Sequence, residues 1–324
     1  MSLAKVLVIG GAGYIGSHVV KALLKENFKV TVYDNLSTGQ SCNLFADAKF
    51  VEGDILDEAK LNATMVEGYD AVVHLAAKKA VGESMENPQL YAQNNIIGSV
   101  NIFNAMLKNK IKNVVFSSTS AVYGTPEYTP LDEKHQLEPL SFYGFTKLEI
   151  ERLMEWYSRL KDFHYIALRY FNAVGYAADG SIKGKEKNSH NLLPIIMDVL
   201  QGERDKLLIY GNDYNTPDGT CLRDYIHVED LASAHVAAIK KLLEEPCSYA
   251  INLGTGKGLS VLEIISAVER VTGRKVRYEF APRRAGDPAE VFAGNELAKK
   301  ILNWQPRYTN IDEIIQTVWN MEQK

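Results

Sequence analysis

A tyrosine and a lysine four residues apart have the clearest chemical potential in this sequence. Tyr143 and Lys147 occur in Tyr-Gly-Phe-Thr-Lys, at the start of a helical pattern. Residues four apart on a helix stand on the same face. A phenol has a pKa of about 10, but a nearby ammonium and an oxidised nicotinamide both favour its phenolate form. Such a tyrosine can take a proton from a carbinol while hydride leaves the same carbon. Alone, the pair is also typical of an exposed helix.

A run of hydroxyl side chains upstream strengthens the catalytic interpretation. Ser117-Ser118-Thr119-Ser120 follow a branched, strand-like run at 114–117. Parallel strands present their carboxyl ends to the ligand crevice, so a hydroxyl there can hydrogen-bond the reacting oxygen. Turn capping is the alternative role for these hydroxyls. Because the hydroxyls and the Tyr–Lys pair follow in the order that one fold requires, we favour an active site.

A glycine loop near the N-terminus predicts a dinucleotide site. Gly10, Gly13 and Gly16 directly follow the apolar run 5–9 and open a helical pattern. Glycine permits positive φ and lets the backbone approach a pyrophosphate, while the helix N-terminus offers unpaired N–H groups. Asp34 ends the next strand-like run, 18 residues after Gly16. A carboxylate there suits a ribose 2′-hydroxyl and repels a 2′-phosphate, so we expect NAD rather than NADP.

The elements around these motifs alternate between strands and helices. Strand-like runs lie at 5–9, 30–34, 50–52, 71–75, 114–117 and 165–169, with helical patterns between most of them. This alternation predicts an α/β fold, a Rossmann-like doubly wound parallel sheet, over residues 1–172. A smaller mixed α/β lobe for the substrate is expected over 173–324, and part of 220–255 is a candidate to return to the first domain. Residues 173–190 are polar and glycine-rich, which suggests a mobile loop.

Composition excludes several classes of protein. The 324 residues are 46% hydrophobic and 23% charged, with a net charge of −4. This balance gives no electrostatic reason to expect nucleic-acid binding, and no apolar run approaches a membrane span. The three cysteines, Cys42, Cys221 and Cys247, are widely spaced. We therefore expect no disulfide framework, no metal site and a cytoplasmic location.

With these residues placed, the chain resembles the extended short-chain dehydrogenase/reductase family, and within it the nucleotide-sugar 4-epimerases. The resemblance covers nearly the whole chain. Its most specific stretches are 10–18, 34–39, 74–84, 168–172, 210–214 and 218–227. The resemblance implies tightly held NAD that is regenerated in every cycle, a UDP-sugar substrate and a homodimer formed through 96–107 and 148–157.

The resemblance also implies roles for individual residues. Tyr143 would be the base, Thr119 the hydroxyl that aids it and Lys147 the third catalytic residue. The cofactor would be lined by Gly10, Gly13, Tyr14, Ile15, Gly16, Asp34, Asn35, Leu36, Ser37, Thr38, Gly39, Asp54, Ile55, Leu75, Ala76, Ala77, Lys79, Asn94, Thr119, Tyr143, Lys147 and Phe171. The substrate would be held by Thr119, Tyr143, Asn172, Asn191, Leu192, Leu208, Ile209, Tyr210, Arg223, Arg284, Asp287 and Val291.

Related activities remain as alternatives. Dehydratases of the family carry an Asp-Glu pair after the threonine, whereas this chain has Ser120 and Ala121, which argues against dehydration. The resemblance therefore implies reversible epimerisation of UDP-glucose and UDP-galactose through a 4-keto sugar. A UDP-glucuronate 4-epimerase and a non-catalytic NAD-binding sensor are the alternatives. Val291 stands where a tyrosine often faces the sugar, so we expect room for an N-acetyl group.

Overall fold

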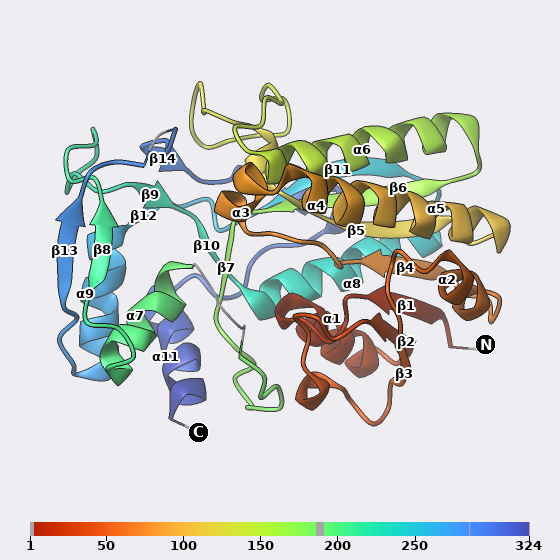
Figure 1. The fold of residues 1–324 in the computed structure, drawn as a ribbon, viewed down its shortest axis with the longest axis horizontal. Helices are drawn as coiled ribbons and strands as arrows, with labels where there is room; N and C mark the ends of the chain where they lie inside the picture. The colour runs from red at the N-terminus through yellow and green to blue at the C-terminus, as the bar shows by residue number, and fades with distance from the viewer. Residues whose placement is uncertain (1–2, 186–190, 285, 324) are drawn as a thin grey trace.

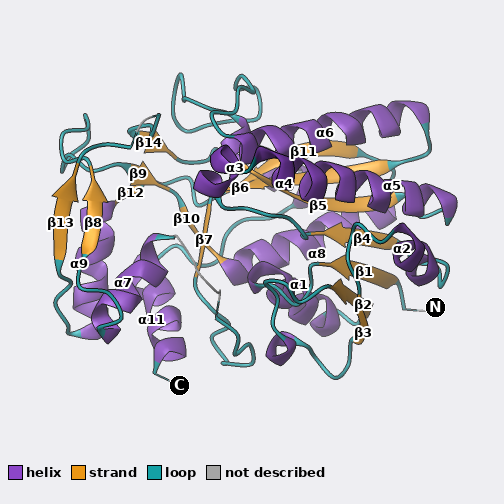
Figure 2. Ribbon diagram, viewed as in Figure 1, coloured by secondary structure: helices purple, strands orange, loops and turns teal. Residues whose placement is uncertain are grey.

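A seven-stranded parallel sheet forms the centre of the molecule (Figures 1 and 2). The computed structural model describes residues 3–185, 191–284 and 286–323. The strands follow in the order β3 (Lys49–Glu52), β2 (Lys29–Asp34), β1 (Lys5–Ile9), β4 (Ala71–His74), β5 (Asn113–Thr119), β6 (His164–Tyr170) and β11 (Ser248–Leu253). The order reverses between β1 and β4, which confirms the predicted doubly wound sheet. A crevice is expected at the carboxyl ends of these strands.

Helices cover both faces of the sheet. Helices α1 (Tyr14–Lys25), α8 (Val228–Glu244) and α10 (Glu296–Leu302) pack on one face, and α2 (Glu58–Met65), α5 (Gly98–Lys108) and α6 (Phe142–Leu160) on the other. Strand β1 shows why: Val6 and Val8 belong to one apolar cluster, and Leu7 and Ile9 to the other. A strand buried on both faces reads as a continuous apolar run, as the sequence predicted.

The segment before α5 contains elements that periodicity did not predict. Short helices α3 (Val81–Glu86) and α4 (Pro88–Tyr91) precede a π-helical turn, η2 (Ala92–Ile97). π-Helical turns occur frequently at functional sites. Two 3₁₀ turns, η1 (Ser41–Asn43) and η3 (Ser120–Val122), follow β2 and β5.

The second lobe is small and mixed, as expected. Its core lies among α7 (Leu192–Gln201), α9 (Val261–Thr272) and α11 (Ile311–Glu322). Its strands form the pairs β8 (Leu207–Tyr210) with β13 (Tyr278–Ala281) and β7 (Asn172–Val174) with β10 (Tyr225–His227), and β9 (Leu222–Arg223) between β12 (Leu259–Ser260) and β14 (Glu290–Val291).

The connection between the lobes differs from the expected mobile loop. Tyr176, Ala177 and Ile182 are buried, so much of 173–185 is packed against the protein; 186–190 lie outside the described residues. The chain also returns to the first domain, because α8 packs on the seven-stranded sheet and β11 is one of its strands, although both follow 173–210 in sequence.

In the part of the chain that the structure describes, no helix is long and apolar enough to cross a bilayer.

Candidate active site

A cavity of about 600 Å³ opens at the carboxyl ends of the central strands. Its volume lies within the range that small-molecule and cofactor sites occupy. Most of the predicted cofactor residues line it: Gly10, Gly13, Tyr14, Ile15, Gly16, Asp34, Asn35, Ser37, Thr38, Ile55, Leu75, Ala76, Ala77, Lys79, Asn94, Tyr143 and Lys147. Helix α6 and the loop after β1, far apart in sequence, therefore meet at one cavity.

The glycine loop is built by close backbone contacts. A Cβ on Gly16 would lie 2.1 Å from the carbonyl oxygen of Gly10, and a Cβ on Gly10 would lie 2.6 Å from the amide nitrogen of Ala76. Gly10 also has a φ of +87°, a conformation that glycine adopts without strain. Gly13 caps α1 without a side-chain hydrogen bond. The cradle and this helix terminus fit a pyrophosphate, whose charge the helix dipole favours.

Asp34 lies at the carboxyl end of β2 and is tied to the glycine loop. Its carboxylate accepts hydrogen bonds from the amides of Ala12 (3.0 Å) and Leu36 (2.8 Å). Burial raises the pKa of the Asp34 carboxyl, and the two amide bonds act to lower it. Next to it, Asn35 donates to Asp54 (2.7 Å). This arrangement fits a carboxylate that accepts from ribose hydroxyls.

Tyr143 lies in the first turn of α6. The hydroxyl of Ser141 caps this helix by accepting from the amide of Gly144 (3.1 Å). Burial raises the pKa of the Tyr143 phenol to about 12, and a hydrogen bond with Thr119 acts to lower it. Burial has the larger effect of the two, and the lowering of this pKa by Lys147 and an oxidised nicotinamide stays a prediction. Thr119 thus contacts the phenol, in agreement with the position that the resemblance implies for it.

Lys147 is almost fully buried, with 2% of its surface exposed. Its ammonium donates to the carbonyl of Ser117 (2.7 Å) and lies 4.7 Å from the centre of the Phe116 ring. Burial lowers the pKa of Lys147 to about 7, while Glu151 acts to raise it. A lysine whose pKa is shifted this close to neutral pH is common at functional sites.

Several cavity residues escaped sequence reasoning. The hydroxyls of Ser117 and Tyr170 hydrogen-bond each other, and both residues line the cavity near Tyr143. The lining residues without a predicted cofactor role are Ile9, Ala12, Tyr33, Gln40, Asn43, Gly53, Ala80, Glu83, Ser117, Tyr170 and Lys185. Ser117 was visible in the hydroxyl run, whereas Tyr170 carries no local signal because only β5–β6 pairing brings it there.

The predicted substrate residues lie outside this cavity lining, Tyr143 excepted. Arg223 on β9 forms an ion pair with Asp287 and also donates to the carbonyl of Pro288 (2.9 Å). Asp224, the next residue in the sequence, does not take part in this pair and accepts from the amide and hydroxyl of Thr255. Arg223 and Asp287 therefore form one unit at the second lobe.

The other predicted substrate residues are distributed over several elements of the second lobe. The Arg284 guanidinium stacks over the Tyr210 ring at 4.0 Å, and Asn172 donates to the carbonyl of Asp224 (3.1 Å). Leu208 is exposed and Ile209 is buried on β8. Asn191 caps α7, which begins at Leu192, and Val291 on β14 pairs with Arg223 in register.

Five predicted cofactor residues do not line the cavity: Leu36, Gly39, Asp54, Thr119 and Phe171. Three of them hydrogen-bond to residues that line the cavity. Leu36 donates to Asp34, Asp54 accepts from Asn35, and Thr119 bonds Tyr143. Gly39 packs closely against Ala12, and Phe171 belongs to an apolar cluster with Tyr123 and Leu148.

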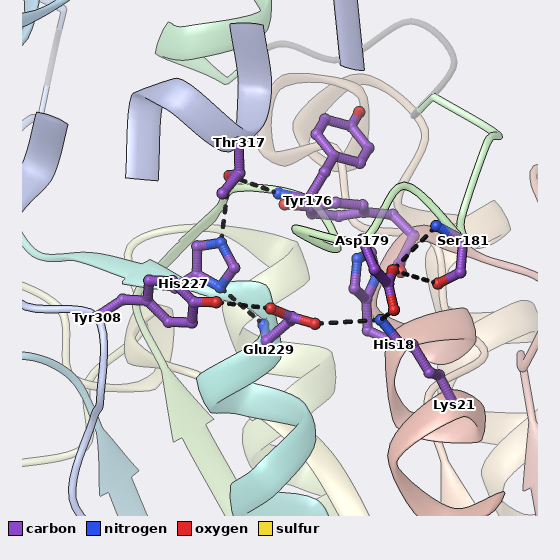
Figure 3. A network of polar contacts seen from close by, with 10 residues as sticks. His18, Lys21, Tyr176, Asp179, Ser181, His227, Glu229, Tyr308 and Thr317 are labelled. Atoms are coloured by element: carbon purple, nitrogen blue, oxygen red, sulfur yellow. Dashed lines mark hydrogen bonds and ion pairs between the residues drawn. The ribbon is translucent and has the colours of Figure 1, made fainter. Parts of the chain in front are cut away.

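A buried polar network joins the two lobes (Figure 3). His227 accepts at Nδ1 from the amide of Glu229 (3.1 Å), so its Nε2–H donates to the hydroxyl of Thr317 on α11 (3.2 Å). That hydroxyl accepts from the amide of Tyr176 (3.1 Å), and the Tyr14 hydroxyl donates to the carbonyl of Gly175 (2.5 Å). The first residue of α1 is thereby tied to the helix that ends the second lobe.

The fold and the site define a class: an enzyme with a dinucleotide-binding sheet, a Tyr–Lys pair and a second lobe for the substrate. Residues 6–254 match the model of the NAD dependent epimerase/dehydratase family, and the chain belongs to this family. It is 45% identical to the UDP-glucose 4-epimerase of Lacticaseibacillus casei over 97% of this chain and 96% of that protein.

Solved structures agree with this assignment. A UDP-glucose 4-epimerase from Brucella ovis in complex with NAD superposes with a TM-score of 0.94 at 45% identity, covering 97% of both chains. A UDP-glucose 4-epimerase from Bifidobacterium longum in complex with NAD+ and UDP gives a TM-score of 0.93 at 36% identity, covering 99% of this chain and 98% of that one. The predicted class, an NAD-dependent nucleotide-sugar epimerase, and the predicted cofactor are confirmed.

Proposed function

We propose that the protein interconverts UDP-glucose and UDP-galactose by removing and returning hydrogen at C4 of the sugar. The observation that carries this proposal is the contact of the Tyr143 phenol with Thr119, one helical turn from the buried Lys147, in a cavity that fits a dinucleotide. The relatives named above carry the same activity in their names.

The chain's own residues would hold the cofactor along the cavity. The glycine loop and the start of α1 take the pyrophosphate, and Asp34 accepts from a ribose. Lys147 keeps its contact with the Ser117 carbonyl and offers its other ammonium protons to the second ribose. When bound, NAD supplies a reversible hydride acceptor, and its oxidised ring carries the positive charge that favours a phenolate at Tyr143.

The acid–base steps would be carried by two hydroxyls. Tyr143, with Thr119 at its oxygen, takes the proton from the sugar 4-hydroxyl as the C4 hydrogen leaves. The resulting 4-keto sugar must then turn, so that the hydrogen would return to the opposite face of C4 while Tyr143 returns the proton to the oxygen. This requires firm contacts to the UDP part and few, replaceable contacts to the sugar, because a site complementary to one epimer would trap the ketone.

The second lobe offers such contacts for UDP. Guanidinium groups bind diphosphates through paired hydrogen bonds, and Arg223 and Arg284 both lie in this lobe. Asp287 orients Arg223 and would accept from hydroxyls of the substrate.

We also propose that the lobes divide near residue 172, with 228–253 belonging to the first lobe.

Val291 has a smaller side chain than the tyrosine that often faces the sugar at this position in the family. We infer that an N-acetyl group on C2 is accepted, so that UDP-N-acetylglucosamine is a second substrate.

Assembly and location complete the proposal. Ile97 and Trp156, at the end of η2 and on α6, are more than half exposed. We infer a homodimer through this helical face, because large exposed apolar side chains on neighbouring helices are typical of interfaces. The three free cysteines and the nucleotide-sugar substrate favour the cytoplasm.

The test is to mix purified protein with UDP-galactose, without added NAD, and to measure UDP-glucose. Conversion supports both the reaction and tightly held NAD. Parallel reactions with the N-acetylated and glucuronate sugars measure the substrate range. Bound NAD with no conversion of any of these sugars would instead support a sensor.

A further inference from the structure

A third residue shares the helix face of Tyr143 and Lys147. Glu151 lies four residues after Lys147 on α6, so the three side chains stand in one row. Only 6% of Glu151 is exposed, and it does not belong to the cavity lining. A buried carboxylate one turn behind a buried lysine requires an explanation, because an unpaired buried charge is costly.

The carboxylate of Glu151 is held from two strands. Arg169 on β6 approaches it with Nη2 2.5 Å from Oε2 and Nε 3.0 Å from Oε1, a two-point ion pair. The hydroxyl of Ser118 on β5 donates to Oε1. Arg169 also donates to the Tyr123 hydroxyl (3.0 Å), which donates in turn to Asn252 on β11 (2.6 Å). The position of Glu151 is thus fixed by three strands.

The three side chains of this row on α6 contact three consecutive residues, 117–119, at the end of β5. The carbonyl of Ser117 accepts from Lys147 at 2.7 Å. The hydroxyl of Ser118 donates to Glu151, and Thr119 hydrogen-bonds Tyr143. Ser118 therefore lies between the two residues that contact Lys147 and Tyr143. A shift of Ser118 would therefore move both of its neighbours.

The charges around Lys147 also indicate a role for Glu151. Glu151 is a negative group facing it from its own helix, and acts against the burial that lowers the pKa of Lys147 to about 7. On the opposite side, burial and Lys147 lower the pKa of His74 on β4 to about 3, so this histidine is neutral. The Phe116 ring and the Tyr143 phenol are uncharged, and the charge of Arg169 is paired with Glu151.

We propose that Glu151, clamped by Arg169, is a positioning residue for the reaction: it fixes Ser118 between the partners of Lys147 and Tyr143 and presents a negative charge to the Lys147 ammonium. The inference rests on the proposed acid–base role of Tyr143. Stability alone does not account for the pair, since a buried ion pair contributes little compared with packed apolar side chains of similar volume.

The test uses the full chain with its bound NAD. In Glu151→Gln we expect kcat to fall about tenfold with KM within about threefold of wild type. The alkaline limb of the kcat profile should move about one pH unit lower, because Lys147 loses its proton earlier without the carboxylate. Glu155→Gln is the matched control: it lies one turn further along α6 in an exposed pair with Arg159, and both limbs should stay unchanged.

A double variant separates charge from folding. Glu151→Met with Arg169→Met replaces the pair by apolar groups of similar size and should unfold near the wild-type temperature. The same loss of kcat and the same shifted limb in this variant support the proposal; a wild-type kcat and profile would overturn it. Ser118→Ala should lower kcat without moving the limb, because the carboxylate stays, and an unchanged kcat there would remove the placement of Ser118 from the proposal.

A measurement independent of turnover keeps the proposal distinct from the function. The Lys147 side chain can be titrated by NMR after isotopic methyl labelling of lysines, in wild type and in Glu151→Gln. A lower pKa in the variant supports the role of Glu151 even if UDP-galactose is not converted, which would count against the proposed function only. Equal pKa values would overturn the electrostatic role.

Discussion

The proposed dinucleotide half and the proposed nucleotide-sugar half of the site are built by different means. Around the glycine loop the backbone itself makes the site, with approaches so close that a methyl group on Gly16 would overlap the carbonyl of Gly10. In the second lobe side chains make it, through the Arg223–Asp287 ion pair and the stacking of Arg284 on Tyr210. A backbone site resists substitution, whereas a side-chain site can change its ligand one residue at a time. We therefore expect cofactor binding to be rigid and substrate range to be adjustable.

The largest effect should come from the residue where the two halves meet. Tyr143→Phe removes the hydroxyl that bonds Thr119, and we expect kcat to fall by about 10² to 10⁴, the usual contribution of a general acid–base group. NAD should remain bound, which its absorbance in the purified variant measures. Tyr157→Phe on the same helix, whose hydroxyl only meets Asn104, is the control. Near-native turnover of Tyr143→Phe would exclude the acid–base role.

The backbone half should break at Gly16. A Cβ there would lie 2.1 Å from the Gly10 oxygen, so Gly16→Ala should lose bound NAD and about 2–3 kcal/mol of unfolding free energy. Gly82→Ala is the control: apart from its chain neighbours and its own helix backbone, no atom of the described residues lies within 4 Å of the added Cβ. This variant should be neutral or stabilising by less than about 1 kcal/mol. Denaturant unfolding and cofactor content measure both. A Gly16→Ala protein that binds NAD normally would contradict the backbone description.

The same difference explains what the sequence could predict. The glycine loop and the Tyr143–Lys147 pair lie within short stretches, so their spacing, together with the motifs before and after them, was enough to predict them. Arg223 was assigned to the substrate by resemblance, but its ion-pair partner Asp287 is 64 residues away, so no local pattern indicates the pair. Tyr170 and the short pairs of strands in the second lobe depend on contacts between distant segments, which no local periodicity encodes.

The side-chain half should respond through binding. Arg223→Met removes the guanidinium, and we expect KM for UDP-galactose to rise about 10- to 100-fold with kcat within about threefold, since charge-assisted hydrogen bonds to a diphosphate are lost in ground and transition state alike. Arg277→Met, in an exposed pair with Asp205 in the same lobe, controls for a general loss of positive charge. If kcat falls while KM stays constant, Arg223 acts on the reaction rather than on binding.

The junction of the halves should be sensitive to acid. Burial lowers the pKa of both His18 and His227 to about 4, below the usual value of about 6.5. The unfolded chain therefore takes up protons first, and each histidine removes about 1.4 kcal/mol of stability per pH unit as the pH falls from 6.5 towards 4. His227→Gln should reduce this slope by one proton, measured by urea unfolding over this range. An equal slope in the variant would show that His227 titrates normally in the folded protein.

The smallest effect tests how adjustable the sugar end is. Val291 is partly buried on β14 beside Arg223, against the cluster that contains Phe171. Val291→Tyr adds a ring at this position, so kcat/KM for UDP-N-acetylglucosamine should fall about tenfold while that for UDP-galactose changes little, because steric exclusion of one group is worth about 1–3 kcal/mol. Val291→Ala, which adds no volume, should keep both activities. Equal exclusion of the acetylated sugar by wild type and Val291→Tyr would show that residue 291 does not set the space at C2, and that the limit lies in the backbone-built half instead.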